Sequence, residues 1–194
     1  MIEKIEKFLK EYNSLSEKEE EAAYAEISEY AERETDKFIT FLKSCDIDDY
    51  GILIDALSAD TKKWSTLFFE EIKRIFIEAD KANNPTRTIM FLDEFVFLEP
   101  EEFLYRKELI SFLKQYLRHH DPVFRYWAIS LIADIVETSD ILSLNLLEKS
   151  LEDKDWRIRY WAYTYLTEIK GAGRYKLSFI DKIKSKLLAP YKFD

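Results

Sequence analysis

The residue types that carry most enzyme chemistry are sparse in this chain. The only histidines are the adjacent pair His119 and His120, and the only cysteine is Cys45. Neighbouring residues on a helix point in directions about 100° apart, so the histidine pair would chelate a metal ion poorly. Three glycines cannot form a glycine-rich phosphate loop, and no HExxH motif occurs. We therefore expect no metal site, no cofactor and no enzymatic activity.

Carboxylates are abundant, above all in the glutamate-rich segment 17–34. A solvated helix face explains this segment better than acid–base catalysis, which needs a carboxyl group with a shifted pKa. The formal net charge of the chain is −9, with 17 acidic and 7 basic residues in 1–60 and a nearly balanced remainder. An acidic end of this kind fits a basic protein partner, although ordinary solvated helix faces would segregate charge in the same way.

The clearest pattern in the sequence is a stretch that occurs twice, 34 residues apart. Residues 121–128 (DPVFRYWA) and 155–162 (DWRIRYWA) share Asp, Arg, Tyr, Trp and Ala at identical spacing. A repeat of this length is one supersecondary unit that cannot bury its apolar face alone. Neighbouring units must therefore stack on one another, and each carries a helix that opens with Asp.

The composition favours long helices joined by short connections. The chain is 47% hydrophobic and 15% aromatic, and it has only three glycines and four prolines, too few for the turns of an all-β fold. It opens without a basic segment followed by an apolar run, and no stretch approaches the roughly 20 apolar residues of a membrane span. With a single cysteine, these features predict a reduced, soluble, cytoplasmic protein that does not enter a membrane.

Apolar periodicity and capping residues place the expected helices along the chain. Ser14 with Glu17, and Ser16 with Glu19, both fit a capping box. The segment 86–98 is predicted as a helix, with a strand as the alternative because Phe95-Val96-Phe97-Leu98 is β-prone. A last helix is marked by Leu177, Ile180, Ile183 and Leu187. The remaining predicted helices cover 2–12, 17–33, 35–42, 49–58, 62–80, 99–118, 122–137, 140–152 and 156–169.

The repeated stretch resembles the second helix of a HEAT repeat, whose pattern is Asp-Pro-x-x-Arg-x-x-Ala followed by an aliphatic stripe. The first unit matches it at Asp121, Pro122, Arg125, Ala128 and Ile132. The second unit matches it at Asp155, Arg159, Ala162 and Leu166, with Trp156 in place of the usual Pro.

The resemblance implies an all-α fold, a right-handed α-α superhelix (a HEAT/ARM-like solenoid) of about five helix pairs. Because the sequence has no low-complexity segment and no flexible linker, we expect a single domain over 1–194, with diverged helices in 1–98 and clearer repeats in 101–188. In the family, the second helices line the concave side and most members bind other proteins.

The charged residues of the repeat have a structural and a functional interpretation. Asp121 and Asp155 stand where an N-cap acceptor belongs, with Arg125 and Arg159 four residues further on. In the HEAT family, such Asp and Arg residues from neighbouring repeats form a charge ladder between turns. The alternative is direct contact of these residues with an anionic ligand.

The aromatic residues of the repeat divide by helical phase. Trp127 and Trp161 share a face with Ala128 and Ala162, which predicts packing in the core or between repeats. Tyr126 and Tyr160 fall on a small, polar face and are expected to stand exposed one repeat apart. Tyr and Arg on such a surface are favoured at protein-binding hot spots. The candidate partner-binding residues are Tyr126, Tyr160, Tyr163, Arg125 and Arg159. Alternatively, the tyrosines lean over grooves between helices, with their hydroxyls in water.

The expected function is non-enzymatic: a protein-interaction module, of inhibitor, immunity or scaffold type, that binds another protein on its concave or acidic surface. The acidic surface would fit a basic partner. The alternative is a DNA alkylation-repair glycosylase with a HEAT-like solenoid. The residues Trp127, Trp156, Trp161, Asp155 and Arg159 resemble the residue types that such enzymes use. Nucleic acid is disfavoured because its binding needs a basic footprint, and the pI here is near 5.0.

Overall fold

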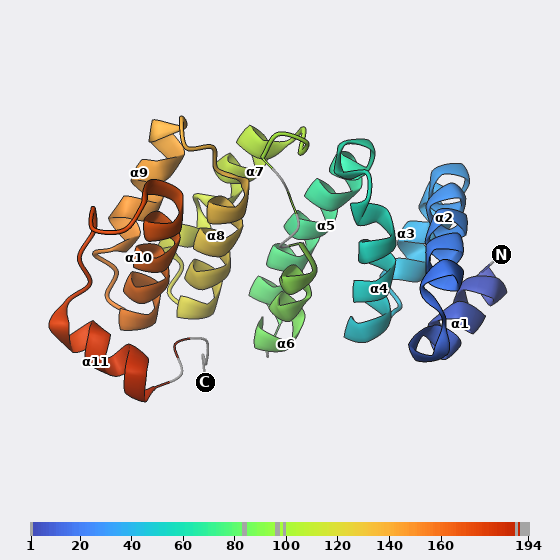
Figure 1. Ribbon diagram of the computed structural model, residues 1–194, viewed down its shortest axis with the longest axis horizontal. Helices are drawn as coiled ribbons and strands as arrows, with labels where there is room; N and C mark the ends of the chain where they lie inside the picture. Colours follow the sequence, from blue (N-terminus) through green and yellow to red (C-terminus); the bar gives the residue numbers. More distant parts are fainter. Residues whose placement is uncertain (1, 83–84, 96–97, 99, 189, 191–194) are drawn as a thin grey trace. The chain divides into compact units, whose positions relative to one another are not determined.

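The computed structural model describes residues 2–82, 85–95, 98, 100–188 and 190, and all regular structure within them is helical (Figure 1). The all-α prediction is therefore confirmed. Backbone contacts divide the chain into two compact units, Met1–Trp64 and Ser65–Asp194, and each is described by itself. The single domain over 1–194 stays a prediction.

The first unit is built from four α-helices that carry the acidic part of the sequence. They are α1 (Ile2–Glu11), α2 (Glu17–Arg33), α3 (Thr35–Leu42) and α4 (Ile47–Ser58), with a short 3₁₀ turn at Tyr12–Ser14. Helix α2 packs against both α3 and α4. Their contact buries large side chains, which include Tyr30, Phe38, Leu42, Tyr50 and Ile54.

One of the two predicted capping boxes exists. The Glu19 carboxylate accepts hydrogen bonds from the backbone N–H and the hydroxyl of Ser16 (2.9 and 2.6 Å), so α2 begins where the sequence predicts. The Ser14 box is wrong, because Ser14 lies in the 3₁₀ turn and donates its hydroxyl to the Glu11 carbonyl (2.7 Å).

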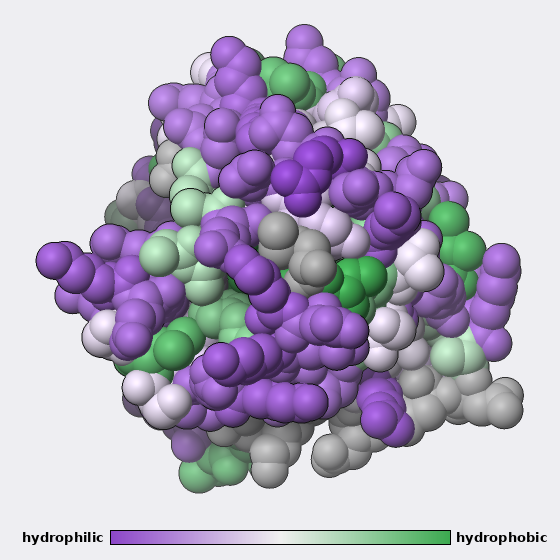
Figure 2. Space-filling model, turned by 90° about the vertical axis from the view of Figure 1, so that its right-hand side faces the viewer, coloured by the Kyte–Doolittle hydropathy of each residue, from purple (hydrophilic) through white to green (hydrophobic). Residues whose placement is uncertain are grey.

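Hydrophilic residues cover most of the face of the first unit that is seen in Figure 2. Most glutamates of α2 are exposed, among them Glu17, Glu21, Glu26 and Glu29. This agrees with a solvated helix face, the interpretation that the sequence favours for segment 17–34.

The second unit contains the rest of the helices. Helix α5 (Thr61–Lys81) begins in the first unit and continues in the second. It is followed by α6 (Pro85–Ile89), the 3₁₀ helix η2 (Met90–Phe95), α7 (Arg106–Leu113), the 3₁₀ helix η3 (Tyr116–Arg118), α8 (Pro122–Ile135), α9 (Ile141–Ser150), α10 (Trp156–Lys170) and α11 (Phe179–Leu187).

Two predicted helices of this unit are shorter than the sequence indicates. Within the segment 86–98, residues up to Phe95 form α6 and then η2; Ile89 of α6 and Leu92 and Phe95 of η2 are fully buried. The spacing of three between Leu92 and Phe95 matches the period of a 3₁₀ helix, so this geometry buries both side chains on one line. The β-prone alternative includes residues 96–97, which lie outside the described residues.

The predicted helix over 99–118 begins late. Residues 100–105 form turns, and α7 starts only at Arg106. Phe103 is buried, and Leu104 donates its backbone N–H to the Ser65 hydroxyl (3.1 Å). These tertiary contacts hold the segment outside a helix despite its favourable Pro and Glu residues. Residue 99 lies outside the described residues.

Helices α8, α9 and α10 stand side by side, and α11 lies against α10 (Figure 1). Most residues of α8 are buried, because α6, α7 and η3 pack against it as well as α9 and α10. Helix α11 contacts α10 through a polar residue. Its one buried residue is Asp181, at 2% exposure, whereas Phe179 is 77% exposed. The apolar residues that predict this helix, Ile180, Ile183 and Leu187, are exposed as well.

Candidate functional site

Both repeat helices begin with the predicted aspartate cap. The Asp121 carboxylate accepts a hydrogen bond from the backbone N–H of Val123, and that of Asp155 accepts one from Arg157, each at 2.9 Å. The caps satisfy amide donors that the first turn of a helix leaves free. The expectation for these two aspartates is confirmed.

Arg125 lies inside the protein and uses its whole guanidinium group there. Its Nε and Nη2 atoms donate to the two carboxylate oxygens of Asp153 (2.8 and 2.9 Å). Its Nη1 atom donates to the carbonyl oxygens of His119 and His120 (2.8 and 3.1 Å). Arg125 is 3% exposed. The predicted contact of Arg125 with a partner conflicts with this burial.

Arg159 repeats the same geometry 34 residues later. Its Nε and Nη2 atoms donate to Asp181 (2.8 and 2.7 Å), and its Nη1 atom donates to the carbonyl oxygens of Asp153 and Lys154 (2.6 and 3.2 Å). The ion pair lowers the pKa of Asp181 and raises that of Arg159.

Each arginine therefore connects the turn before its own helix to a later segment: Arg125 to the turn before α10, and Arg159 to α11. The arginines form the expected ladder, but their acidic partners are Asp153 and Asp181. The capping residues Asp121 and Asp155 are not those partners, because their carboxylates already serve the first helical turns.

The three candidate tyrosines are half-buried, so the expectation that Tyr126 and Tyr160 stand exposed is wrong. The Tyr126 ring of α8 lies 5.7 Å from the Trp161 ring of α10, and burial raises the pKa of its hydroxyl. Tyr160 packs edge-on against Trp161 (5.5 Å), which in turn stacks on Tyr165 (5.6 Å). Tyr126 therefore fits the alternative interpretation better than the exposed position: its ring leans across the groove between α8 and α10.

Below these rings lies a carboxylate that the sequence analysis missed. Tyr165 donates its hydroxyl to Ser130 (2.9 Å), and Asp134 follows Ser130 by one helical turn. One oxygen of Asp134, Oδ2, is buried and has no hydrogen-bond partner among the described residues. Burial, with a smaller contribution from the negative charge of Glu168, raises the pKa of Asp134 to about 7. A signal existed in the sequence, since Asp134 is the only charged residue between Tyr126 and Ile135.

We call this surface the α8–α10 face and define it by its aromatic and acidic residues: Tyr126, Asp134, Tyr160, Trp161, Tyr165 and Glu168. The candidate residue Tyr163 is not part of it, because it lies about 160° around α10 from Trp161 and Tyr165. Aromatic rings present a negative face, and carboxylates carry or can acquire a negative charge. The arrangement therefore favours cations over anions.

The other candidate reactive residues, His119 and Cys45, contact neighbouring groups of the fold or are partly buried. His119 places Nε2 3.0 Å from Asp80, and its Nδ1 accepts the backbone N–H of Asp121 (3.2 Å). Burial raises the pKa of the Cys45 thiol to about 11, so this residue is not a thiolate nucleophile at neutral pH. The part of the chain that the structure describes has no group of three or more His, Cys, Asp or Glu residues arranged to hold a metal ion.

Comparison with protein-family models, with curated proteins and with solved structures finds no match for this chain. The likeness to HEAT repeats stays a prediction that rests on the residues of the repeat. No helix among the described residues is both long and apolar enough to cross a membrane.

Proposed function

We propose that this chain is a non-enzymatic protein-interaction module, of inhibitor or scaffold type, that receives basic side chains of a partner protein on the α8–α10 face. The observation that carries the proposal is Asp134, a half-buried residue whose Oδ2 atom is buried and has no hydrogen-bond partner among the described residues, beside a row of aromatic rings.

A cation is the ligand that such a site would bind most favourably. A buried carboxylate without a compensating group is costly to ionise, and a positive charge placed beside it offsets that cost. A guanidinium group can also stack on the rings of Tyr126 and Tyr160. The net charge of −9 would speed the approach of a basic partner from solution.

The fold that we propose for this module is a right-handed α-α superhelix of HEAT type with about five helix pairs. The pairs α7–α8 and α9–α10 would be successive repeats. The matching contacts of Arg125 and Arg159 support this, because each reaches back to carbonyls five and six residues earlier and forward to an aspartate. A rigid stacked scaffold loses little conformational entropy on binding. A cytoplasmic location is part of the proposal and rests on the single cysteine.

A DNA alkylation-repair glycosylase stays an alternative with less support. Asp155 caps its own helix and also pairs with Arg157 (2.7 Å), while Arg159 is held by Asp181. Trp127 is buried at the helix contact. These side chains are engaged in holding the fold, so they are poorly placed to act on a base.

The proposal predicts which peptides the protein selects. From a random peptide library displayed on phage, we expect the immobilised chain to enrich sequences rich in Arg and Lys. For the best selected peptide, Tyr126→Ala with Tyr160→Ala should weaken binding about 10-fold or more, because buried aromatic contacts dominate binding energies. Fluorescence anisotropy of the labelled peptide measures the change.

The matched control is Tyr175→Ala, which removes a half-buried tyrosine of the same unit outside the α8–α10 face. It should leave peptide affinity unchanged. Asp134→Asn provides a second test, since it should weaken the same peptide without unfolding the chain. Enrichment of acidic peptides, or equal loss of affinity in the Tyr175 variant, would contradict the proposal.

A further inference from the structure

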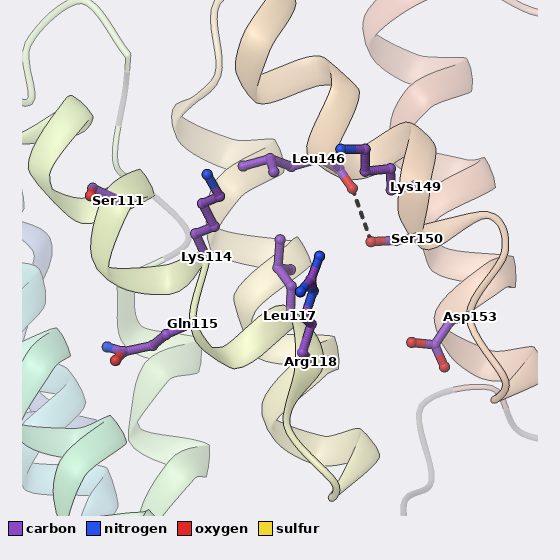
Figure 3. Close-up of a pocket in the computed structure, with 9 residues that line it drawn as sticks. All are labelled: Ser111, Lys114, Gln115, Leu117, Arg118, Leu146, Lys149, Ser150 and Asp153. Carbon is purple, nitrogen blue, oxygen red and sulfur yellow. Dashed lines mark hydrogen bonds between the residues drawn. The ribbon is translucent and has the colours of Figure 1, made fainter.

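A cationic pocket lies in the second unit, away from the α8–α10 face. It has a volume of about 570 Å³ and is formed by the segment from α7 to η3 on one wall and by α9 on the other (Figure 3). Lys114 and Arg118 come from the first wall and Lys149 from the second. Pockets that hold small ligands are typically about 300–1,000 Å³.

Local helix physics explains why three cations meet at this place. Lys114 caps the C-terminus of α7, Arg118 ends η3, and Lys149 lies in the last turn of α9. A cation is favoured in each position because the carbonyl groups at a helix C-terminus carry negative partial charge. The fold brings the three C-terminal turns to one pocket, and their cations with them.

The positive charge of the pocket is not neutralised by neighbouring residues. Lys114, Arg118 and Lys149 are exposed, and none of them forms an ion pair within the described ranges. The carboxylate on the pocket wall, Asp153, already pairs with Arg125 through both oxygens. The negative charge of Asp153 therefore neutralises Arg125 and not the three cations of the pocket.

The pocket also offers neutral groups beside the cations. The Ser111 hydroxyl can donate a hydrogen bond to an anion, and Leu117 and Leu146 supply apolar surface. The Ser150 hydroxyl donates to the Leu146 carbonyl (3.1 Å), a bond drawn in Figure 3. Charged donors next to apolar walls suit a ligand that has a phosphate part and a less polar part.

We propose that this pocket binds a small phosphorylated ligand that carries two or more linked phosphate groups. Three uncompensated cations match the charge of a diphosphate or triphosphate better than that of a single carboxylate. A compact anion is attracted by the local charge. A long nucleic acid would also meet the net charge of −9 of the whole chain, which repels it.

The proposal is tested by calorimetry with pyrophosphate, tripolyphosphate and ATP at low salt. The pocket variant carries Lys114→Gln, Arg118→Gln and Lys149→Gln. Its matched control carries Arg174→Gln, Lys182→Gln and Lys186→Gln, which removes the same residue types and the same charge from exposed positions of the same unit. We expect the pocket variant to bind tripolyphosphate about 10-fold or more weakly than the wild type, and the control to bind within about 2-fold of it.

Two-dimensional NMR of the wild type locates the ligand. Tripolyphosphate should shift amide signals in 111–118 and 146–153. Equal weakening in both variants, or shifts scattered over the exposed lysines, would overturn the proposal, because the binding would then follow net charge alone. Tighter binding of a short single-stranded oligonucleotide than of tripolyphosphate would also overturn it. All substituted residues are exposed, so circular dichroism should show unchanged folding.

Discussion

Two charged residues of α8, Arg125 and Asp134, differ in how completely their buried atoms are hydrogen-bonded. Arg125 makes hydrogen bonds with all three of its nitrogen atoms, whereas Asp134 keeps a buried oxygen without a partner among the described residues. The first arrangement stabilises the fold. The second costs free energy, and a cost of this kind is often retained where a ligand removes it.

The pH dependence of stability should reveal Asp134. Its pKa is raised from 3.8 to about 7, so between these values the folded chain holds a proton that the unfolded chain has released. Through this group, the free energy of unfolding falls as pH rises from about 4 to 7. Asp134→Asn removes the loss, and we expect a gain on the order of 1–2 kcal/mol at pH 8 and little gain at pH 4.

Thermal unfolding of both proteins, followed by circular dichroism at pH 4, 6 and 8, measures this difference. A gain that is equal at all three pH values would show that Asp134 ionises normally. A variant that is more stable at pH 8 and yet binds basic peptides less well would tie the unpaired carboxylate to partner binding.

At the scale of elements, the arginine ladder decides how the helices of the second unit are joined. Arg125 connects the turn before α8 to the turn before α10, and Arg159 connects the turn before α10 to α11. Helix α11 depends on this contact most, because Asp181 is its one buried residue.

Replacing Arg125 should be the most damaging change in the ladder. Arg125→Ala leaves Asp153 and two carbonyl groups without their partner, and we expect a loss of about 3–5 kcal/mol in the free energy of unfolding. Arg159→Ala should cost less, because its side chain is 25% exposed and water can replace part of the contact. Urea unfolding measures both.

Two further variants control this comparison. Arg125→Lys should restore little, because an ammonium group cannot donate two parallel bonds to Asp153 and also reach both carbonyls. Arg174→Ala removes an exposed arginine and should change stability by less than about 0.5 kcal/mol. A smaller loss for Arg125→Ala than for Arg159→Ala would refute the assignment.

At the scale of the whole molecule, charge is distributed unequally between the two compact units. Residues 1–64 carry 17 acidic and 9 basic side chains, whereas residues 65–194 carry 21 acidic and 20 basic ones. Repulsion between like charges therefore destabilises the first unit more than the second.

Added salt should stabilise the first unit more than the second. We expect added sodium chloride to slow amide hydrogen exchange in the buried helices of 1–64, by raising their free energy of opening by about 0.5 kcal/mol, and to have less effect in 65–194. Hydrogen exchange with mass spectrometry resolves both parts in one experiment. Sodium chloride should be compared with an equal osmolality of sucrose, which does not screen charge. Equal slowing by both solutes would contradict the electrostatic explanation.

Much of the fold could be predicted because local signals carry it. The predicted bounds of α2 and α3 match the structure, since a capping box and apolar periodicity set them locally. The segments 86–98 and 99–118 differ from prediction where tertiary contacts prevail, through buried Leu92, Phe95 and Phe103 and the bond from Leu104 to Ser65.

The candidate site was predicted less well than the fold. Helical phase placed Tyr126 and Tyr160 on one surface, but it overestimated their exposure and included Arg125, which is buried. Asp134 could not be predicted because its environment depends on the neighbouring helix α10. The cationic pocket could not be predicted because it joins residues of α7, η3 and α9 that are not adjacent in the sequence.

The sequence by itself determined the helical class, the 34-residue repeat and the aspartate caps, because these depend on interactions within a few turns of one helix. Only the tertiary structure decided which acid each arginine contacts, which carboxylate has a buried oxygen without a partner among the described residues, and which helix ends share a pocket. Such properties arise where distant segments meet, since burial and electrostatic interaction depend on distance in space.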